Sequence, residues 1–157
     1  MTTRVLMVCL GNICRSPTAA SVMAQKVYAR GLSDRIVVDS CGTADYHIGA
    51  PADARMVKAA AARGYDMSKH RARQLTLADF DKYDLILAAD KSNVKDIATL
   101  RYSRPHPGMA QVRLFLDILY PGEGKAIPDP YYGGKEGFET VVDLCEQGAR
   151  AWVEKLQ

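Results

Sequence analysis

The residues best equipped for chemistry lie near the start of the chain, in the sequence Val8-Cys9-Leu10-Gly11-Asn12-Ile13-Cys14-Arg15-Ser16-Pro17. A glycine-bearing loop that enters a helix presents unpaired N–H groups, which together bind a tetrahedral oxyanion. Arg15 adds a planar, permanently charged fork that can hold two oxygens of such an anion. The same dipoles favour the thiolate of Cys9, so this stretch predicts a sulfur nucleophile beneath a bound tetrahedral anion.

The neighbouring residue types support this interpretation. Gly11 and Asn12 tolerate the positive φ that a tight cradle needs, and Ser16 can donate a hydrogen bond toward the sulfur. The alternative is that Cys9 is a small buried hydrophobic residue and Arg15 a solvated helix residue, because the bare spacing is common by chance. The preceding strand and the Ser-Pro helix start favour the functional interpretation. The loop lacks the Gly-Lys-Ser/Thr of a nucleotide-binding loop, and no second ligand pair accompanies Cys9 and Cys14 for a zinc site.

The elements that must position this loop alternate along the chain. Short apolar runs predict strands at residues 3–8, 36–39, 85–89 and 112–115. Helices are expected from Ser16-Pro17 to Gly31, with Ser16 as cap and Pro17 as first helical residue, and over 53–63 and 92–100. The last helix carries the longest apolar stripe, formed by Phe138, Val141, Val142, Cys145, Ala149, Trp152 and Val153.

This alternation predicts an α/β fold: a single domain with a four-stranded parallel sheet, helices on both faces and the anion-binding loop after the first strand. The loops 102–108 and 120–134 concentrate Pro and Gly, and ligands bind at such strand ends in open α/β sheets. With 157 residues and 48% apolar content, residues 1–157 are expected to form one domain.

Charge and composition bear on the binding partners and the cellular location that we expect. The net charge of +3 is scattered, so no nucleic-acid surface is expected, and the apolar run after Met1 is too short for a signal peptide or membrane span. We therefore expect a cytoplasmic protein. In that reducing compartment the four cysteines should be free thiols, with Cys41 and Cys145 structural.

The sequence resembles the low-molecular-weight protein tyrosine phosphatase family. Beyond the opening loop, the similarity includes Asp39-Ser40, Tyr46-His47-Ile48-Gly49, His70 with Ala72-Arg73-Gln74, the segment around Asp90, and Asp129-Pro130-Tyr131-Tyr132. The resemblance implies hydrolysis of phosphotyrosine monoesters in proteins through a cysteinyl phosphate. Cys9 is then the nucleophile, Arg15 the phosphate clamp, and Asp129 the general acid and later the base. Without the resemblance, Asp129 would be read as a turn residue.

The resemblance implies further roles. The phosphate-binding loop comprises Leu10, Gly11, Asn12, Ile13 and Cys14. Asn12, Ser40 and His70 are expected to hydrogen-bond one another and support the loop. Tyr46, Tyr131 and Tyr132 would line the substrate pocket with Leu10 and Ile13, and Cys14 would form a protective disulfide with Cys9. From residue type alone, His70 is a surface residue, Ser40 a turn former and the tyrosines ordinary loop residues.

The resemblance also implies a monomer without cofactor or metal, whose partners are phosphotyrosine-containing proteins and which inorganic phosphate or vanadate inhibits. Some relatives carry tryptophan at the position of Tyr46, which bears on substrate preference. One alternative is an arsenate reductase on the same fold, which needs extra cysteines after the third strand; residues 88–97 contain none. Another is a non-catalytic phosphotyrosine-binding module, which the joint presence of Cys9, Arg15 and Asp129 disfavours.

Overall fold

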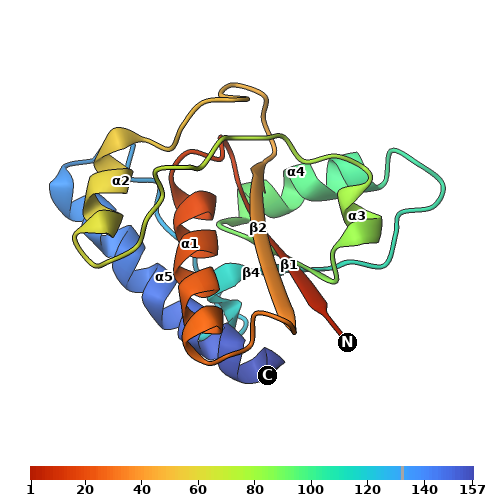
Figure 1. The fold of residues 1–157 in the computed structure, drawn as a ribbon. Helices are drawn as coiled ribbons and strands as arrows, with labels where there is room; N and C mark the ends of the chain where they lie inside the picture. Colours follow the sequence, from red (N-terminus) through yellow and green to blue (C-terminus); the bar gives the residue numbers. More distant parts are fainter. Residues whose placement is uncertain (132) are drawn as a thin grey trace.

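Four parallel strands form one sheet in the order β2-β1-β3-β4 (Figure 1). The structure is a computed structural model and describes residues 1–131 and 133–157. Within these residues the strands are β1 (Thr3–Cys9), β2 (Ile36–Gly42), β3 (Leu85–Ala88) and β4 (Gln111–Leu114). The helices are α1 (Arg15–Ala29), α2 (Ala54–Ala61), α3 (Asp79–Lys82), α4 (Lys91–Arg101), the 3₁₀ helix η1 (Phe115–Ile118) and α5 (Lys135–Leu156).

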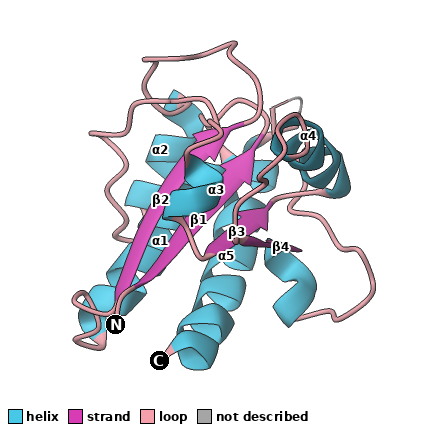
Figure 2. Cartoon of the chain, turned by 90° about the vertical axis from the view of Figure 1, so that its right-hand side faces the viewer, coloured by secondary structure: helices cyan, strands magenta, loops and turns pink. Residues whose placement is uncertain are grey.

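Helices cover both faces of the sheet, as predicted. Successive side chains of a strand point to opposite faces, so β1 divides its apolar residues between two cores. Val5 and Met7 pack into the core that includes residues of α1 and α5, whereas Leu6 and Val8 pack into the core with α3 and α4. Figures 1 and 2 show α1, α2 and α5 on one side of the strands and α3 and α4 on the other. The buried apolar strands are therefore those of a doubly covered parallel sheet.

The order of the strands places a crevice at the end of β1. β1 pairs with β2 on one side and with β3 on the other, so the chain reverses its direction of winding at this strand. In open α/β sheets such a switch point opens a crevice beyond the carboxyl ends of the strands, where ligands bind. The loop after β1 lies in that position.

The helix start at α1 differs from the sequence prediction. Ser16 is not the cap: α1 begins at Arg15, its N-cap is Cys14, and no side chain caps it. Pro17 is consequently the third helical residue, where its missing N–H is still no loss because first-turn amides have no partner within the helix. The hydroxyl of Ser16 is thus available to the loop.

The other boundaries differ by smaller amounts. β2 continues to Gly42, beyond the predicted end at Asp39, because it pairs along β1 as far as Cys9. Phe115 begins η1 instead of ending β4. Both η1 and the short helix α3 were missed, since neither is long enough to show a helical period. Within the described residues, no helix is long and apolar enough to cross a membrane.

Candidate active site

The carbonyl groups of the loop between β1 and α1 accept hydrogen bonds from neighbouring segments. Three backbone amides from two other segments donate to them, and an amide in the first turn of α1 donates to a fourth. The pairs are Thr43 N to Cys9 O (2.9 Å), Ala44 N to Leu10 O (3.0 Å), Asp53 N to Ile13 O (2.8 Å) and Thr18 N to Cys14 O (3.2 Å). Because these carbonyls are directed outward, the peptide groups between them turn their N–H groups toward the enclosed side.

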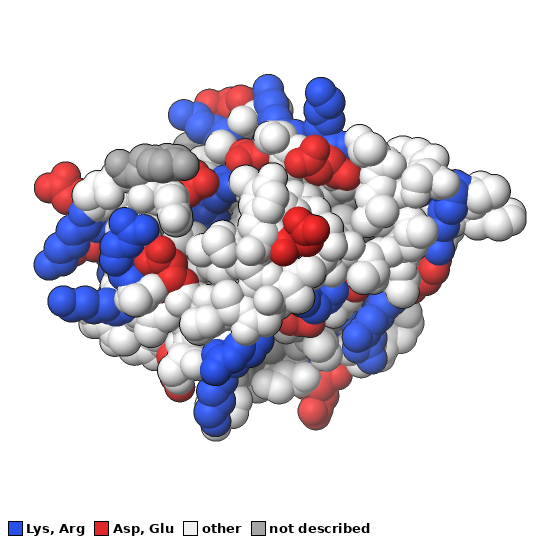
Figure 3. Space-filling model, turned by 90° about the horizontal axis from the view of Figure 1, so that it is seen from above, with Lys and Arg blue, Asp and Glu red and all other residues white. Residues whose placement is uncertain are grey.

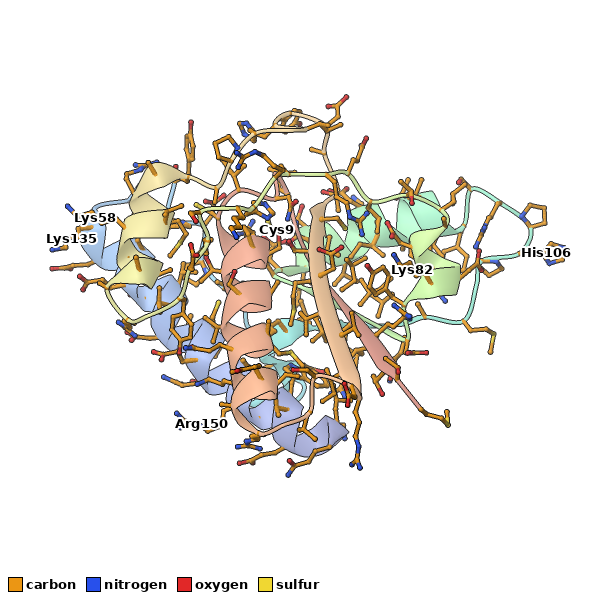
Figure 4. All side chains as sticks on the ribbon, viewed as in Figure 1. Cys9, Lys58, Lys82, His106, Lys135 and Arg150 are labelled. Atoms are coloured by element: carbon orange, nitrogen blue, oxygen red, sulfur yellow. The ribbon has the colours of Figure 1, made fainter. Side chains whose placement is uncertain are left out.

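The amides of the loop are thus available to a ligand. Those of Gly11, Asn12, Ile13 and Cys14 donate to no acceptor among the described residues. Three of these residues, Gly11, Ile13 and Cys14, line a pocket of about 420 Å³ at the end of the sheet, where Figure 4 labels Cys9. A ring of inward amides beside a helix N-terminus is an arrangement that can bind an anion.

Asn12 holds the loop in shape. Its φ of 58° is the only positive value at a non-glycine position among the described residues. The buried side chain donates from Nδ2 to Oγ of Ser16 (2.9 Å) and Oγ of Ser40 (3.0 Å), and its Oδ1 accepts from the Arg73 amide (3.0 Å). Its own carbonyl is 2.7 Å from Nε2 of His70. The structure therefore brings Asn12, Ser40 and His70 together, with Asn12 as the common partner.

Burial favours the neutral form of His70, and the contact to Asn12 fixes which ring nitrogen carries the proton. Burial lowers the pKa of His70 below its usual 6.5. The Asn12 carbonyl is an acceptor, so Nε2 must carry the ring proton and donate it.

Gly42 allows β2 to approach the loop. A Cβ atom at this position would lie 2.6 Å from Leu10 O and 3.1 Å from Asn12 N, both backbone atoms. A side chain at Gly42 would therefore displace the loop, and glycine is required for close packing here rather than for a positive φ.

Cys9 lies at the base of the pocket, with its Sγ 2.9 Å from Oγ of Ser16. Ser16 already accepts from Asn12, so its hydroxyl proton is free for the sulfur or for the Cys41 carbonyl at 3.3 Å. The shorter contact is the one to Cys9. A thiolate at this position would thus receive a hydrogen bond from Ser16, in the role that the sequence predicted for it.

Arg15 is buried and anchored along one edge of its guanidinium. Nη1 donates to Asp90 Oδ2 (2.7 Å) and to the Ile127 carbonyl (3.1 Å). Nη2 lies 3.9 Å from Asp129 Oδ2. With Nη1 fixed, the remaining N–H groups are directed at the pocket that Arg15 lines. The guanidinium group of Arg15 is therefore held in a fixed orientation beside the loop amides.

Asp129 lies across the pocket from the loop, on the segment before α5. Its side chain is half-exposed, and Oδ1 accepts from the Tyr131 amide (3.0 Å). The segment is held by Ile127, whose amide donates to Ala89 O (2.9 Å) and whose carbonyl accepts from Arg15. Arg15 thus helps to fix the segment that carries Asp129.

The pocket walls include most of the predicted residues. Leu10, Ile13, Tyr46 and Tyr131 line it, together with His47, which the sequence analysis did not assign to the site. His47 lies directly over Gly11, where an added Cβ would be 2.9 Å from its Cδ2. Tyr132 was also predicted here, but it lies outside the described residues.

The cysteines differ in their surroundings, although all four are free thiols. Burial, followed by the nearby Asp53 carboxylate, raises the pKa of Cys14 to about 12, so this pocket thiol stays protonated at neutral pH. Burial likewise raises the pKa of Cys41 and of Cys145, consistent with structural roles. Among the described residues, no group of three or more His, Cys, Asp and Glu side chains is arranged to hold a metal ion.

Two contacts of the site were missed from the sequence. The first is the contact of Asp90 with Arg15. The sequence feature that could have drawn attention to Asp90 is its spacing from Asn93, because the two residues form a capping box at the start of α4, directly after β3. Arg73 supports Asn12 through its backbone amide, for which residue type gives no signal.

Comparison with known proteins decides the family. The sequence model of the low molecular weight phosphotyrosine protein phosphatases matches residues 4–157. The chain belongs to this family. A phosphatase of the family from Schizosaccharomyces pombe is 43% identical over 91% of this chain and 90% of its own length. The activity of this low-molecular-weight phosphatase is accordingly that of a phosphotyrosine protein phosphatase, and the alternatives of an arsenate reductase or a non-catalytic module are not supported.

Solved structures of similar phosphatases share the fold. The protein tyrosine phosphatase of Entamoeba histolytica, solved with Hepes in its active site, superposes with a TM-score of 0.89 and 34% identity, covering 99% of this chain and 97% of its own. Vibrio vulnificus Wzb was solved in complex with benzylphosphonate, with a TM-score of 0.84, 33% identity, and coverage of 99% of this chain and all of its own. Structures similar to this phosphatase thus bind phosphate-like ligands.

Proposed function

We propose that Cys9 is the nucleophile of this phosphatase and that Arg15 and the loop amides bind the phosphoryl group it attacks. In the first step the Cys9 thiolate forms a bond to phosphorus, and the bond from phosphorus to the tyrosine oxygen breaks. Asp129 donates its proton to that oxygen, since a phenolate whose conjugate acid has a pKa of about 10 is a poor leaving group. The substrate protein leaves with its tyrosine side chain dephosphorylated.

The second step hydrolyses the cysteinyl phosphate. Asp129, now a carboxylate, takes a proton from water as the water oxygen attacks phosphorus. The bond between sulfur and phosphorus breaks, and Ser16 stabilises the departing thiolate through its hydrogen bond. The anchored Arg15 and the inward amides hold the equatorial oxygens in both steps, so catalysis is mainly positioning and electrostatic stabilisation.

One observation carries this assignment of roles. Cys9, Arg15 and Asp129 line the same pocket, although Asp129 lies more than a hundred residues from the loop in the sequence. Each also has the partner its role needs: Ser16 for the sulfur, Asp90 for the guanidinium, and an exposed carboxylate oxygen for proton transfer.

The test is hydrolysis of a series of aryl phosphates whose phenols differ in acidity. Replacing the acid, Asp129→Asn, should lower kcat/KM, which reports only the step in which the phenol leaves, by about 10²- to 10⁴-fold for the least acidic phenol. The loss should shrink as the phenol becomes more acidic, because such phenols leave without a proton. A uniform loss across the series would remove Asp129 as the general acid.

Cys9→Ser should abolish turnover while retaining phosphate and vanadate binding, which calorimetry measures. The matched control for Asp129→Asn is Asp117→Asn, because Asp117 pairs with Arg113 outside the pocket. Turnover by Cys9→Ser at the wild-type rate would overturn the proposal.

The remaining expectations from the sequence extend this proposal. We infer that phosphotyrosine-containing proteins are the substrates, that inorganic phosphate and vanadate compete for the loop, and that the protein acts as a cytoplasmic monomer. Competitive inhibition by vanadate, cell fractionation and sedimentation velocity test these three statements in turn.

We also infer reversible oxidation at the site. Hydrogen peroxide would transfer one oxygen to the Cys9 thiolate, which gives a sulfenic acid and releases hydroxide. The Cys14 sulfur would then displace the sulfenic oxygen as water, forming a disulfide that an added dithiol reduces. Cys14 lines the same pocket as Cys9, which supports this pairing.

A further inference from the structure

A second, larger pocket lies beside the active site, between α2 and the beginning of α5. Its volume is about 710 Å³, compared with about 420 Å³ for the active-site pocket. The charged residues along it are Arg55, Lys58, Arg63, Lys135 and Glu139. We call this pocket the α2–α5 groove.

The groove holds two lysines without an ion-pair partner in the part of the chain that the structure describes. Of its other cations, Arg55 pairs with Asp53, and Arg63 pairs with both Asp143 and Glu146 of α5. Lys58 and Lys135 form no ion pair with any described residue, and Glu139 is the one carboxylate in the described lining. Figure 4 shows the two lysines at the same end of the molecule, and Figure 3 shows basic side chains along that edge with acidic ones among them.

The floor of the groove is largely apolar. Phe138 is 2% exposed and lies beneath the Arg55 guanidinium, whose central carbon is 4.7 Å from the centre of the ring. The accessible floor is therefore formed by Ala59, Ala62 and the outer face of the Arg55 guanidinium. A free inorganic ion would gain nothing from such a floor. A peptide with carboxylate side chains could place its methylene groups on the floor and its charges beside the lysines.

The groove also adjoins the active site. Arg55 donates from Nη1 to the carbonyl of Tyr131 (3.4 Å), and its guanidinium lies 5.5 Å from the centre of the Tyr131 ring. Tyr131 in turn lines the active-site pocket. Among the described residues this contact joins the linings of the two pockets, so a chain with its phosphotyrosine in the first pocket can extend past Tyr131 toward the second.

We propose that the α2–α5 groove binds a carboxylate-rich segment adjoining the phosphotyrosine of a protein substrate. The inference rests on the proposed function, in which the substrates are phosphotyrosine-containing proteins. Lys58 and Lys135 attract the carboxylates, and the apolar floor accommodates the chain between them.

The test compares phosphotyrosyl peptides that differ only in charge. Three glutamates are placed on the amino-terminal side of the phosphotyrosine in one peptide and on the carboxyl-terminal side in another, and glutamine replaces them in two matched peptides. Two exposed ion pairs of ordinary strength should raise kcat/KM about fivefold at low salt for one of the glutamate peptides. The gain should lie in KM and decline as salt is added.

The double variant Lys58→Gln/Lys135→Gln should lose this preference while hydrolysing para-nitrophenyl phosphate and the glutamine peptides at the wild-type rate. The control is Lys82→Gln/Arg150→Gln, which removes the same charge far from the groove, as Figure 4 shows. The control should retain the preference.

Two results would overturn the groove proposal: no preference for either glutamate peptide in the wild type, or equal loss of preference in both double variants, which would indicate net charge alone. Failure of the proposed function gives a different result, because then none of the four phosphotyrosyl peptides would be hydrolysed.

Discussion

The carboxylate of Asp90 accepts a hydrogen bond of 2.7 Å from Nη1 of Arg15, and so joins the two halves of the sheet at the switch point. Asp90 follows β3, whereas Arg15 begins the helix that follows β1. The second oxygen of Asp90 accepts from the Asn93 amide (2.8 Å) and caps α4. One side chain therefore fixes both a helix start and the orientation of the phosphate-binding guanidinium.

This double role predicts the behaviour of Asp90→Asn. An asparagine can still cap α4, but its amide nitrogen cannot accept from Arg15. The guanidinium should lose its fixed orientation, and kcat/KM for para-nitrophenyl phosphate should fall about ten- to hundredfold. The inhibition constant of inorganic phosphate should rise, because the same guanidinium binds the ground-state anion.

The matched control is Asp81→Asn, which removes one carboxylate from an exposed pair with Arg104. It should leave both kinetic constants near the wild-type values, since exposed pairs contribute little. If Asp90→Asn bound phosphate as tightly as the wild type, Asp90 would be a helix cap and nothing more.

Two substitutions of Asn12 separate the contribution of its hydrogen bonds to stability from that of its positive φ. Asn12→Ala removes the side-chain hydrogen bonds to Ser16, Ser40 and the Arg73 amide in a buried place, and should lower the free energy of unfolding by about 2–4 kcal/mol. Asn12→Gly loses the same bonds but accepts the positive φ, so it should be about 1 kcal/mol more stable than Asn12→Ala. Urea unfolding monitored by the fluorescence of Trp152 measures both. Equal stability of the two variants would show that the loop relaxes to negative φ.

The local parts of this site could be predicted from the sequence, and the contacts between distant segments could not. Cys9, Gly11 and Arg15 are in one short stretch, so residue type and the strand before them indicated an anion-binding loop. Asp90 reaches Arg15 only because β3 lies beside β1, and strand order was not available from hydrophobic pattern. The support from Arg73 is a backbone amide, which every residue but proline possesses.

The misplaced start of α1 has a similar cause. Ser16 and Pro17 favour a helix start by residue type, but Ser16 uses its hydroxyl on Cys9 and Asn12 instead of on a first-turn amide. A local capping preference was thus overridden by contacts within the loop. The resemblance to the phosphatase family supplied Asp129 and His70, whose residue types alone gave no functional signal.

From the position of Cys14 we predict that oxidation of Cys9 is reversible. Because burial raises the pKa of Cys14 to about 12, its thiol is a poor target for peroxide, and the first oxidation should occur at Cys9. After peroxide treatment, a dithiol should restore most of the wild-type activity but little of the activity of Cys14→Ser, whose Cys9 proceeds to irreversible forms. Cys145→Ser, a change in the buried stripe of α5, is the control and should recover like the wild type. Full recovery of Cys14→Ser would exclude the protective disulfide.

His70 makes the stability of the fold depend on pH. Burial lowers its pKa in the folded chain, whereas in the unfolded chain it titrates near 6.5. As the pH falls through 6.5, the unfolded chain therefore binds a proton that the folded chain does not, and the free energy of unfolding decreases. The decrease ends below the folded pKa, where both states are protonated and Nε2 of His70 still donates to the Asn12 carbonyl.

The measurement is the melting temperature of the wild type and of His70→Gln between pH 7.5 and 5.5. Glutamine can still donate to the Asn12 carbonyl but does not titrate, so the variant should lose less stability than the wild type across this interval. His106→Gln is the matched control, because His106 is exposed on the loop after α4, away from the site in Figure 4, and its removal should leave the wild-type slope. If His70→Gln and the wild type declined in parallel, the pH dependence would have to come from the carboxylates instead.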